Sequence, residues 1–297
     1  MSIVSNRIKT MFIVSLVTAF LAFAVYYICY VAGYGQYAIV LAVVIASVSS
    51  LVSYFSCHKL VLSISGARPA DDIADAYVKG ALSKLCAAAN LPMPKVYIID
   101  DPVANAFATG RNPKNAVVCV TTGLLQKMDD YELEGVLAHE LAHIGNRDIL
   151  LSTIVTVMVG IVVIISDFFS RSLWWGGYRR NSNNKNRNSA SALALVGLVF
   201  MILAPIAGQL MKLALSRNRE YLADATAAKY TGSPYGLINA LRKLGGETDS
   251  VARATNATAN LYITNPLKAA NGKRLRSLFS THPPIEDRIK ALNELIG

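Results

Sequence analysis

The chain has 297 residues, enough for one large domain or two ordinary ones. Hydrophobic residues make up 53% of it and charged residues only 16%, against roughly a quarter charged in a typical soluble domain, which excludes a disordered chain and a coiled coil. The net charge of +10 would favour a nucleic-acid partner in a polar chain, but in a chain this apolar it favours a membrane, so we expect no nucleic-acid binding.

The first hydrophobic segment, residues 10–56, contains no charged residue. As one helix it would be about 70 Å long, more than twice the roughly 30 Å of a hydrocarbon core, so it must fold back. The Gly-Tyr-Gly sequence at residues 33–35 marks the turn between spans at about residues 10–32 and 37–56. A cleavable signal peptide is the alternative, but its apolar region of about 7 to 15 residues is too short to match. We predict that residues 1–56 form a transmembrane hairpin.

Residues 57–148 form the first predicted water-facing part. Acidic residues that follow Ala70 favour a helix from there to Ala89. Apolar runs at residues 95–99 and 116–120 follow turn signals rich in Pro and Asn, which predicts two strands.

The next predicted helix has clear signals at both ends. Asp129 or Asp130 can cap its start, with Glu132 in the position that completes a capping box. Gly145 and Asn146 can end it in a left-handed conformation.

This helix carries the most specific motif, which consists of His139, Glu140 and His143 in an H-E-x-x-H pattern. The two histidines are four residues apart, so both imidazoles leave one face about 6 Å apart and can reach one zinc ion at about 2.1 Å. The carboxylate of Glu140 can take a proton from a metal-bound water. The alternative is two ordinary histidines and a solvated glutamate, but a chance match is improbable in a chain with four histidines. A catalytic zinc site also needs a third protein ligand.

Two further uncharged blocks, residues 149–166 and 190–211, are each long enough to span a bilayer. The loop between them, residues 171–187, holds five basic residues, no acidic residue and both tryptophans of the chain, which suit a membrane interface. We predict that residues 149–211 form a second hydrophobic hairpin.

Residues 212–297 form the second water-facing part and contain the candidates for the third ligand. Glu220 and Asp224 are four residues apart, so a helix would direct both carboxylates at one place. One could bind the metal while the other accepts the ring N–H of a ligating histidine. Alone, such a pair beside Arg217 and Arg219 is more often a solvated, ion-paired helix face, but the missing ligand of the H-E-x-x-H helix favours the metal site.

With these motifs the chain resembles the HtpX-type membrane zinc metalloproteases, which are gluzincins related to the CAAX prenyl proteases. The resemblance covers nearly the whole chain and is carried by the motifs at residues 105–110, 139–148, 216–224 and 281–288. It implies a mainly α-helical membrane protein with about four transmembrane helices and a cytoplasmic zincin-like α+β domain with a small edge-stranded sheet. It also implies one zinc ion per chain, with the following roles: His139, His143 and Glu220 as zinc ligands, Glu140 as general base and Asp224 as a partner of a ligand.

The resemblance also gives roles to two other segments. His282 and Arg288 are donors that could stabilise the oxyanion of a tetrahedral intermediate. The alternative for this segment is a Pro-capped helix start, and both can be true. Residues Asn105, Ala106 and Phe107 would form an edge strand that holds an extended substrate by β-addition.

The shared site constrains the topology. Because His139 and Glu220 must reach one metal, an even number of membrane crossings separates them. Basic residues at positions 7 and 9 place the N-terminus in the cytoplasm, which also places the catalytic parts there, as in a multi-pass protein of a bacterial-type plasma membrane. The basic loop of the second hairpin would then lie outside, against the positive-inside tendency. A hairpin on the membrane surface, or one that re-enters it, is the alternative.

The predicted function is zinc-dependent endoproteolysis of membrane and membrane-associated polypeptides, and the resemblance implies that these are misfolded or damaged proteins. Processing of lipidated C-termini is a second hypothesis, although that family resembles longer chains with more spans. A transporter or channel is a third, and it predicts polar or broken spans that this sequence mostly lacks. The partners expected are polypeptide substrates and the lipid bilayer, and the sequence does not determine the oligomeric state.

A cysteine introduced at Ser182 tests the second hairpin. If both blocks span the membrane, a membrane-impermeant thiol reagent labels this cysteine from the outside of intact cells. Labelling from the cytoplasmic side alone would exclude the four-span topology.

Overall fold

The computed structural model describes most of the two predicted water-facing parts and the helix that leads into them. The described ranges are residues 37–154, 217–254, 258–259, 261–266 and 282–295, with residue 35 and scattered residues before it. The predicted span at residues 10–32 is described only at scattered positions. Most of the block at residues 149–166 and all of the block at residues 190–211 lie outside the described residues.

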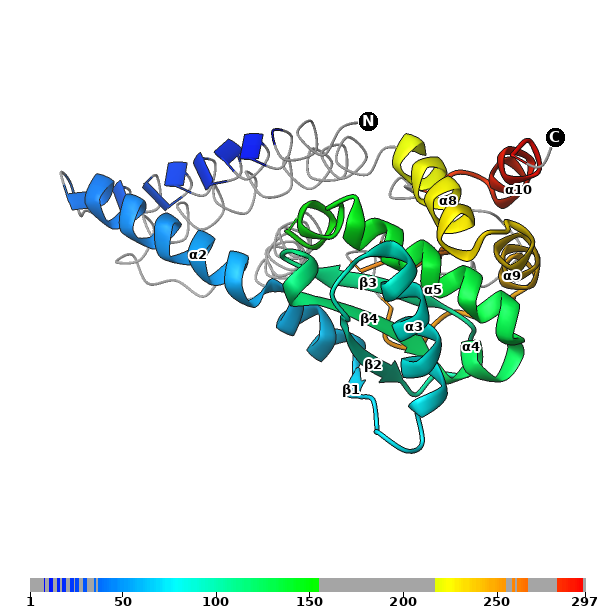
Figure 1. The fold of residues 1–297 in the computed structure, drawn as a ribbon. Helices are drawn as coiled ribbons and strands as arrows, with labels where there is room; N and C mark the ends of the chain where they lie inside the picture. The colour runs from blue at the N-terminus through cyan, green and yellow to red at the C-terminus, as the bar shows by residue number, and fades with distance from the viewer. Residues whose placement is uncertain are drawn as a thin grey trace, which may run out of the picture.

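Helix α2, Tyr37–Ser65, is one continuous helix of 29 residues that includes the predicted span at residues 37–56. It extends away from the strands and meets them at its C-terminal end (Figure 1). The side chains of Val40, Val43 and Val48 are more than half exposed. Within the described ranges, no helix is both long enough and apolar enough to cross a membrane.

A small mixed sheet lies at the centre of the described residues. Its strands run in the order β1, β2, β4, β3, with β2 parallel to β4 and both outer strands antiparallel to their neighbours. The bounds of the four strands are β1 Arg68–Pro69, β2 Lys95–Ile99, β3 Ala106–Gly110 and β4 Ala116–Thr121. The strands predicted at residues 95–99 and 116–120 are therefore confirmed, and β3 is an edge strand.

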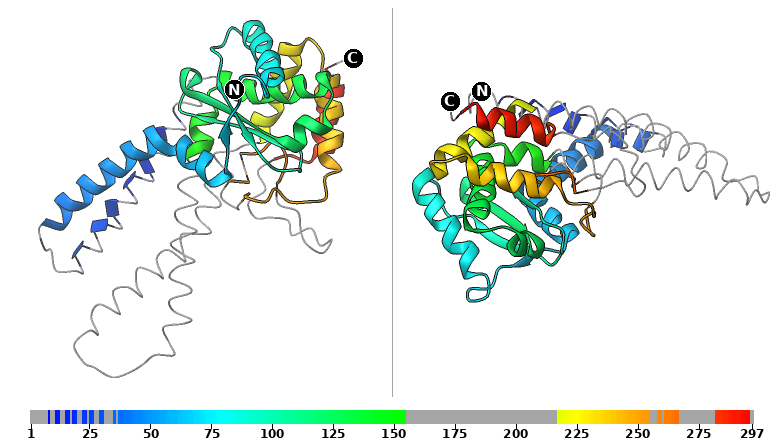
Figure 2. Two further views of the ribbon diagram at one scale, coloured as in Figure 1. Left: turned by 90° about the horizontal axis from the view of Figure 1, so that it is seen from below. Right: turned by 90° about the vertical axis from the view of Figure 1, so that its right-hand side faces the viewer.

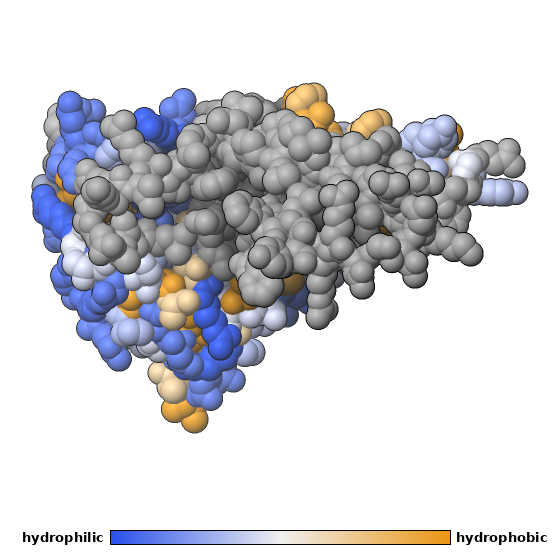
Figure 3. Space-filling model, turned by 180° about the vertical axis from the view of Figure 1, so that it is seen from behind, coloured by the Kyte–Doolittle hydropathy of each residue, from blue (hydrophilic) through white to orange (hydrophobic). Residues whose placement is uncertain are grey.

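Helices cover one face of this sheet. The larger hydrophobic core lies between the sheet and helices α3 and α5, and α5 is also covered by α8 and α9 (Figures 1 and 2). Seen from behind, the described surface is mainly hydrophilic with small hydrophobic areas (Figure 3). The helices and one short 3₁₀ turn are bounded as follows: α3 Ala76–Ala89, η1 Pro113–Asn115, α4 Thr122–Lys127, α5 Asp130–Gly145, α8 Arg217–Thr231, α9 Tyr235–Gly245 and α10 Ile285–Asn293.

The helix predicted from Ala70 begins later than expected. The Asp71 carboxylate accepts the backbone N–H groups of Ile73 and Ala74, which forms a turn instead of a first helical turn. Helix α3 therefore starts only at Ala76.

The other face of the sheet is covered by the C-terminal end of α2 and by Val251, Leu261 and Tyr262. Leu62 of α2 joins a second buried cluster with Phe107 and Tyr262, whose rings meet edge to face with centroids 4.9 Å apart. The sheet is thus enclosed on both faces, and each face packs against a different part of the chain.

Helix α5 is fixed at its start and along its length. The predicted capping box is present, because Asp129 accepts the N–H of Glu132 while the Glu132 carboxylate accepts the N–H of Asp129. Two glycines bring the backbones of α5 and α9 together. A Cβ on Gly135 would lie 2.5 Å from the nitrogen of Leu237, and one on Gly236 would lie 2.2 Å from the Tyr131 carbonyl oxygen.

A methyl group at Gly135 tests this close approach. Alanine favours a helix over glycine by about 1 kcal/mol, but at this position it must force α9 away, so we expect Gly135→Ala to lower stability by about 1 to 3 kcal/mol. The control is Gly80→Ala in α3, where a Cβ meets nothing within 4 Å and stability should rise. Thermal unfolding in detergent measures both, and an equal gain in both variants would contradict the packing described here.

Candidate metal centre and active site

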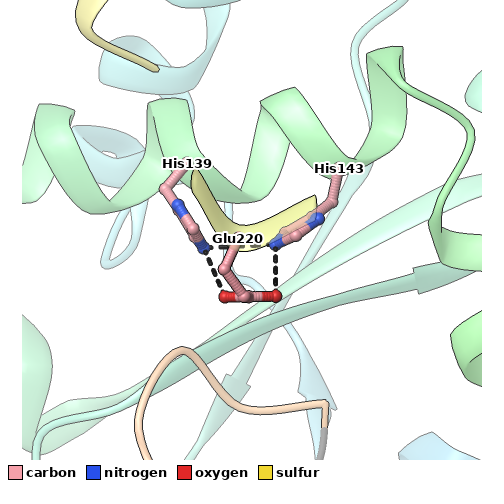
Figure 4. Close-up of side chains that lie close together, drawn as sticks. All are labelled: His139, His143 and Glu220. Carbon is pink, nitrogen blue, oxygen red and sulfur yellow. Dashed lines mark hydrogen bonds and ion pairs between the residues drawn. The ribbon is translucent and has the colours of Figure 1, made fainter. Parts of the chain in front are cut away.

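Helices α5 and α8 bring three ligand atoms together in the structure. The Nε2 atoms of His139 and His143 lie 3.1 Å apart. The Glu220 carboxylate faces both, with its oxygens 3.7 Å from each nitrogen (Figure 4). The three predicted metal ligands therefore converge, although Glu220 comes from a helix that is distant in sequence.

The donor set fits a zinc ion. A tetrahedral zinc site with ligands at about 2.1 Å has edges of about 3.4 Å, which the three observed separations bracket. Glu220 Oε2 is buried and has no hydrogen-bond donor in the described part of the chain. A cation between the three side chains would complete the coordination of these groups, and this is the one cluster of such ligands among the described residues.

Both histidines have a carboxylate on the far side of the ring. His139 Nδ1 lies 2.9 Å from Asp224 Oδ1, and His143 Nδ1 lies 3.4 Å from Asp148 Oδ2. Such partners hold each ring so that its Nε2 faces the metal. The sequence predicts Asp224 as a partner of a ligand and points to no role for Asp148.

Asp148 reaches His143 because of the turn that ends α5. The expected left-handed residue was Gly145 or Asn146, but the structure places it at Arg147, with φ of 59°. The backbone N–H of Asp148 then donates to the His143 carbonyl. This turn folds the chain back and brings the Asp148 carboxylate beside the ring.

Arg288 of α10 is fully buried and pairs with Asp224 rather than facing an open space. Its Nε and Nη2 atoms donate to the two oxygens of Asp224 at 2.9 and 2.6 Å, and its Nη1 donates to the Ile263 carbonyl at 3.0 Å. Nη1 also lies 3.9 Å from Glu220 Oε2. Arg288 thus holds the carboxylate that holds His139.

Glu140 and His282 line one small cavity beside these ligands. The cavity of about 30 Å³ is bordered by Ala108 of β3, His143 and Glu220 as well. Glu140 is 1% exposed, and His282 Nε2 lies 3.6 Å from Glu220 Oε2. Two of the three predicted catalytic side chains, Glu140 and His282, therefore line the same cavity as two of the three predicted ligands.

Comparison with known proteins assigns the family. A model of peptidase family M48 matches residues 72–296. The chain belongs to peptidase family M48. A "Protease HtpX homolog" of Caldanaerobacter subterraneus is 41% identical over 98% of this chain and 96% of its own length. Another with the same description, from Tropheryma whipplei, is 48% identical over 82% of this chain and 81% of its own.

One solved structure shows the same fold. The crystal structure of S. mikatae Ste24p superposes with a TM-score of 0.52 at 18% sequence identity, covering 98% of this chain and 66% of that one. Membership of family M48 shows that the chain is a metalloendopeptidase, which confirms the predicted enzyme class. Peptidases of this family depend on zinc, which agrees with the His, His, Glu cluster.

Burial and neighbouring charges shift the pKa values of the buried groups in the M48 site. Burial raises the pKa of Glu140 to about 7, so this carboxyl is near its midpoint at neutral pH, as a group that takes and returns a proton should be. Burial also acts to raise the pKa of Glu220, but the charges of His282 and His143 outweigh it and bring it to about 2. Burial lowers the pKa of His139 to about 4. Glu220 is therefore ionised and His139 neutral, which are the forms that bind metal. For His143, burial acts to lower the pKa, but the hydrogen bond to Asp148 and the charge of Glu220 outweigh it and raise the pKa to about 9, so zinc must displace a proton from this ring when it binds.

The sequence predicts that the edge strand at Asn105, Ala106 and Phe107 is free to pair with a substrate, and the structure differs from this prediction. The Ala106 carbonyl accepts the N–H of Ile263, and Phe107 forms a bridge with Tyr262. The chain's own backbone thus lies where the prediction placed a substrate. Backbone groups on an edge strand point outward at alternate residues, so the next outward carbonyl belongs to Ala108, which borders the cavity.

Arg219 is a further residue of the site, and the sequence pattern assigns it no role. It is 2% exposed and lines the same cavity of the M48 site. Its Nε lies 3.7 Å from Asp148 Oδ1, and among the described residues none of its guanidinium nitrogens has a hydrogen-bond acceptor. This buried guanidinium is available to a polar group that enters the cavity.

Replacement of Glu220 by alanine tests the ligand set of this M48 chain. Loss of an outer hydrogen-bond partner typically weakens metal binding by about 10- to 100-fold, so loss of a ligand should weaken zinc binding by at least about 100-fold. Zinc content measured by mass spectrometry after dialysis against a weak chelator should fall from one per chain towards zero. Glu286→Ala, an exposed glutamate of α10, is the control and should keep its zinc. Unchanged zinc in Glu220→Ala would exclude this residue as a ligand.

Proposed function

We propose that this metalloendopeptidase is integrated in a bacterial-type plasma membrane and cleaves misfolded or damaged membrane and membrane-associated proteins. The observation that carries the proposal is the convergence of His139, His143 and Glu220 next to the buried Glu140. The catalytic parts, residues 57–148 and 212–297, face the cytoplasm.

Each side chain of the site has a proposed part in hydrolysis. His139, His143 and Glu220 would hold a zinc ion, which would supply Lewis acidity towards the scissile carbonyl and towards a water molecule. Glu140 takes the proton of that water and returns it to the leaving amine. His282, on the same cavity, donates a hydrogen bond to the developing oxyanion.

We assign Arg288 a positioning role instead of the predicted oxyanion contact. All of its donating nitrogens already have acceptors in Asp224 and Ile263. By holding Asp224, Arg288 fixes the ring of His139 and, through the charge near Glu220, keeps the third ligand ionised.

The narrow site favours an extended substrate. A cavity of about 30 Å³ beside the almost fully buried Glu140 is far too small for a folded surface, and we propose that the substrate enters as an extended strand. We propose that it pairs with the outward carbonyl of Ala108, beyond the part of β3 that pairs with residues 262–263. Chains that expose extended segments, as misfolded proteins do, are therefore the preferred substrates.

Membrane integration is supported by the sequence and by the surface of α2. The uncharged residues 10–56 are too long for one crossing and suit the proposed hairpin of residues 1–56. The half-exposed valines of α2 would leave a large apolar face in contact with water if no lipid covered it. We propose that residues 149–211 form a second membrane hairpin, which returns the chain to the side of α5.

Glu140→Gln tests the mechanism. The variant retains the ligands but has no base, so we expect unchanged zinc content and a rate of proteolysis lower by about 100- to 10,000-fold. Purified protein in detergent is incubated with an unfolded soluble protein and, separately, with an integral membrane protein. Glu134→Gln, on the same helix and partly exposed, is the control and should remain active.

The outcomes separate the parts of the proposal. Full activity of Glu140→Gln with equal zinc would exclude Glu140 as the base. Cleavage of the unfolded soluble protein alone would exclude membrane proteins as substrates but leave the mechanism standing.

A further inference from the structure

A second cavity, remote from the metal site, lies between the end of α2 and the sheet face opposite α5. It has a volume of about 220 Å³. Its walls come from three separate parts of the chain: His58, Lys59 and Leu62 of α2, then Met93, Lys95 and Tyr97 at the start of β2, then residues 114–117 at the start of β4. The fold itself therefore assembles this cavity, since no single segment could form it.

The lining is strongly basic. Lys59, Lys95 and Lys114 border the cavity, and none of the described residues that line it is acidic. In the described part of the chain, none of these three lysines forms an ion pair with a carboxylate, whereas Lys79, Lys127 and Lys243 each do. Three like charges around one cavity repel each other, so an anion that binds there lowers the electrostatic energy.

His58 supplies a second, independent observation. Its Nδ1 is buried and has no hydrogen-bond partner among the described residues. Burial, followed by the charges of Lys59, Arg111 and Lys95, lowers the pKa of His58. A buried ring nitrogen without a partner is uncommon in a native protein, and it belongs to a side chain that borders this cavity.

The position of the cavity along the proposed membrane normal indicates that the anion is part of a lipid headgroup. This step rests on the membrane integration proposed above. Lys59 lies three residues beyond the proposed span at residues 37–56 of the continuous helix α2, or about 4.5 Å along its axis. Lipid headgroups extend several ångströms beyond the hydrocarbon core on each side. The guanidinium of Arg111 lies 4.8 Å from the ring centroid of Phe55, at the end of the same span.

We propose that this cavity binds the phosphate group of an anionic lipid headgroup. The three lysines surround the phosphate, and His58 donates a hydrogen bond to it. The site lies on the sheet face opposite the metal centre, so the bound lipid fixes the orientation of the catalytic domain on the membrane without entering the active site.

Lipid binding to the full chain in detergent tests the proposal. Binding of short-chain phosphatidylglycerol, short-chain phosphatidylcholine and inorganic phosphate is measured by native mass spectrometry and by calorimetric titration. We expect phosphatidylglycerol to bind most tightly. Each lysine near an anionic headgroup contributes roughly fivefold, so the triple variant Lys59→Gln, Lys95→Gln, Lys114→Gln should bind it about 100-fold more weakly.

A matched triple variant controls for net charge. Lys84→Gln, Lys229→Gln and Lys290→Gln remove three exposed lysines elsewhere and should leave binding unchanged. Equal loss in both triple variants, or equal affinity for the two lipids, would overturn the site. Inorganic phosphate that binds as tightly as the anionic lipid would overturn the lipid assignment. Thermal unfolding confirms that both variants fold, and because no proteolysis is measured, failure here leaves the proposed protease function untouched.

Discussion

The buried ion pair between Arg288 and Asp224 is the interaction on which the site depends. A guanidinium and a carboxylate without water are tolerated only when each satisfies the other, and removal of one partner typically costs about 3 to 5 kcal/mol. This pair joins the C-terminal helix α10 to α8, and Asp224 in turn holds His139 of α5. Three helices from distant parts of the chain are therefore tied at one point, beside the metal ligands.

The features that could be predicted from sequence are those determined by local spacing. Residue types that lie a few positions apart predict the capping box at Asp129 and the two strands, and the structure contains the capping box and both strands. His139 and His143 share a face because of helical periodicity alone. Glu220 could be inferred because the zinc site lacked a ligand, and the structure brings its carboxylate to the two histidines.

The remaining features depend on tertiary contacts that no local pattern specifies. Asp148 faces His143 only because Arg147 adopts a left-handed conformation, which is unusual for an arginine. Arg219 is buried because α8 packs its first turn against the site, a contact that the sequence pattern does not specify. The basic cavity could not be foreseen, since its lysines belong to three segments that the sheet brings together.

The pairing of residues 262–263 with β3 has a consequence for how copies of this protein meet. An uncovered edge strand invites the edge of another molecule, which leads to aggregation, and natural proteins commonly cover such edges. Here the chain covers the first part of its own edge with Ile263 and Tyr262. Among the described residues, this leaves only the remainder of β3 from Ala108 onward for a neighbouring copy to pair with, so the edge open to association between molecules is short.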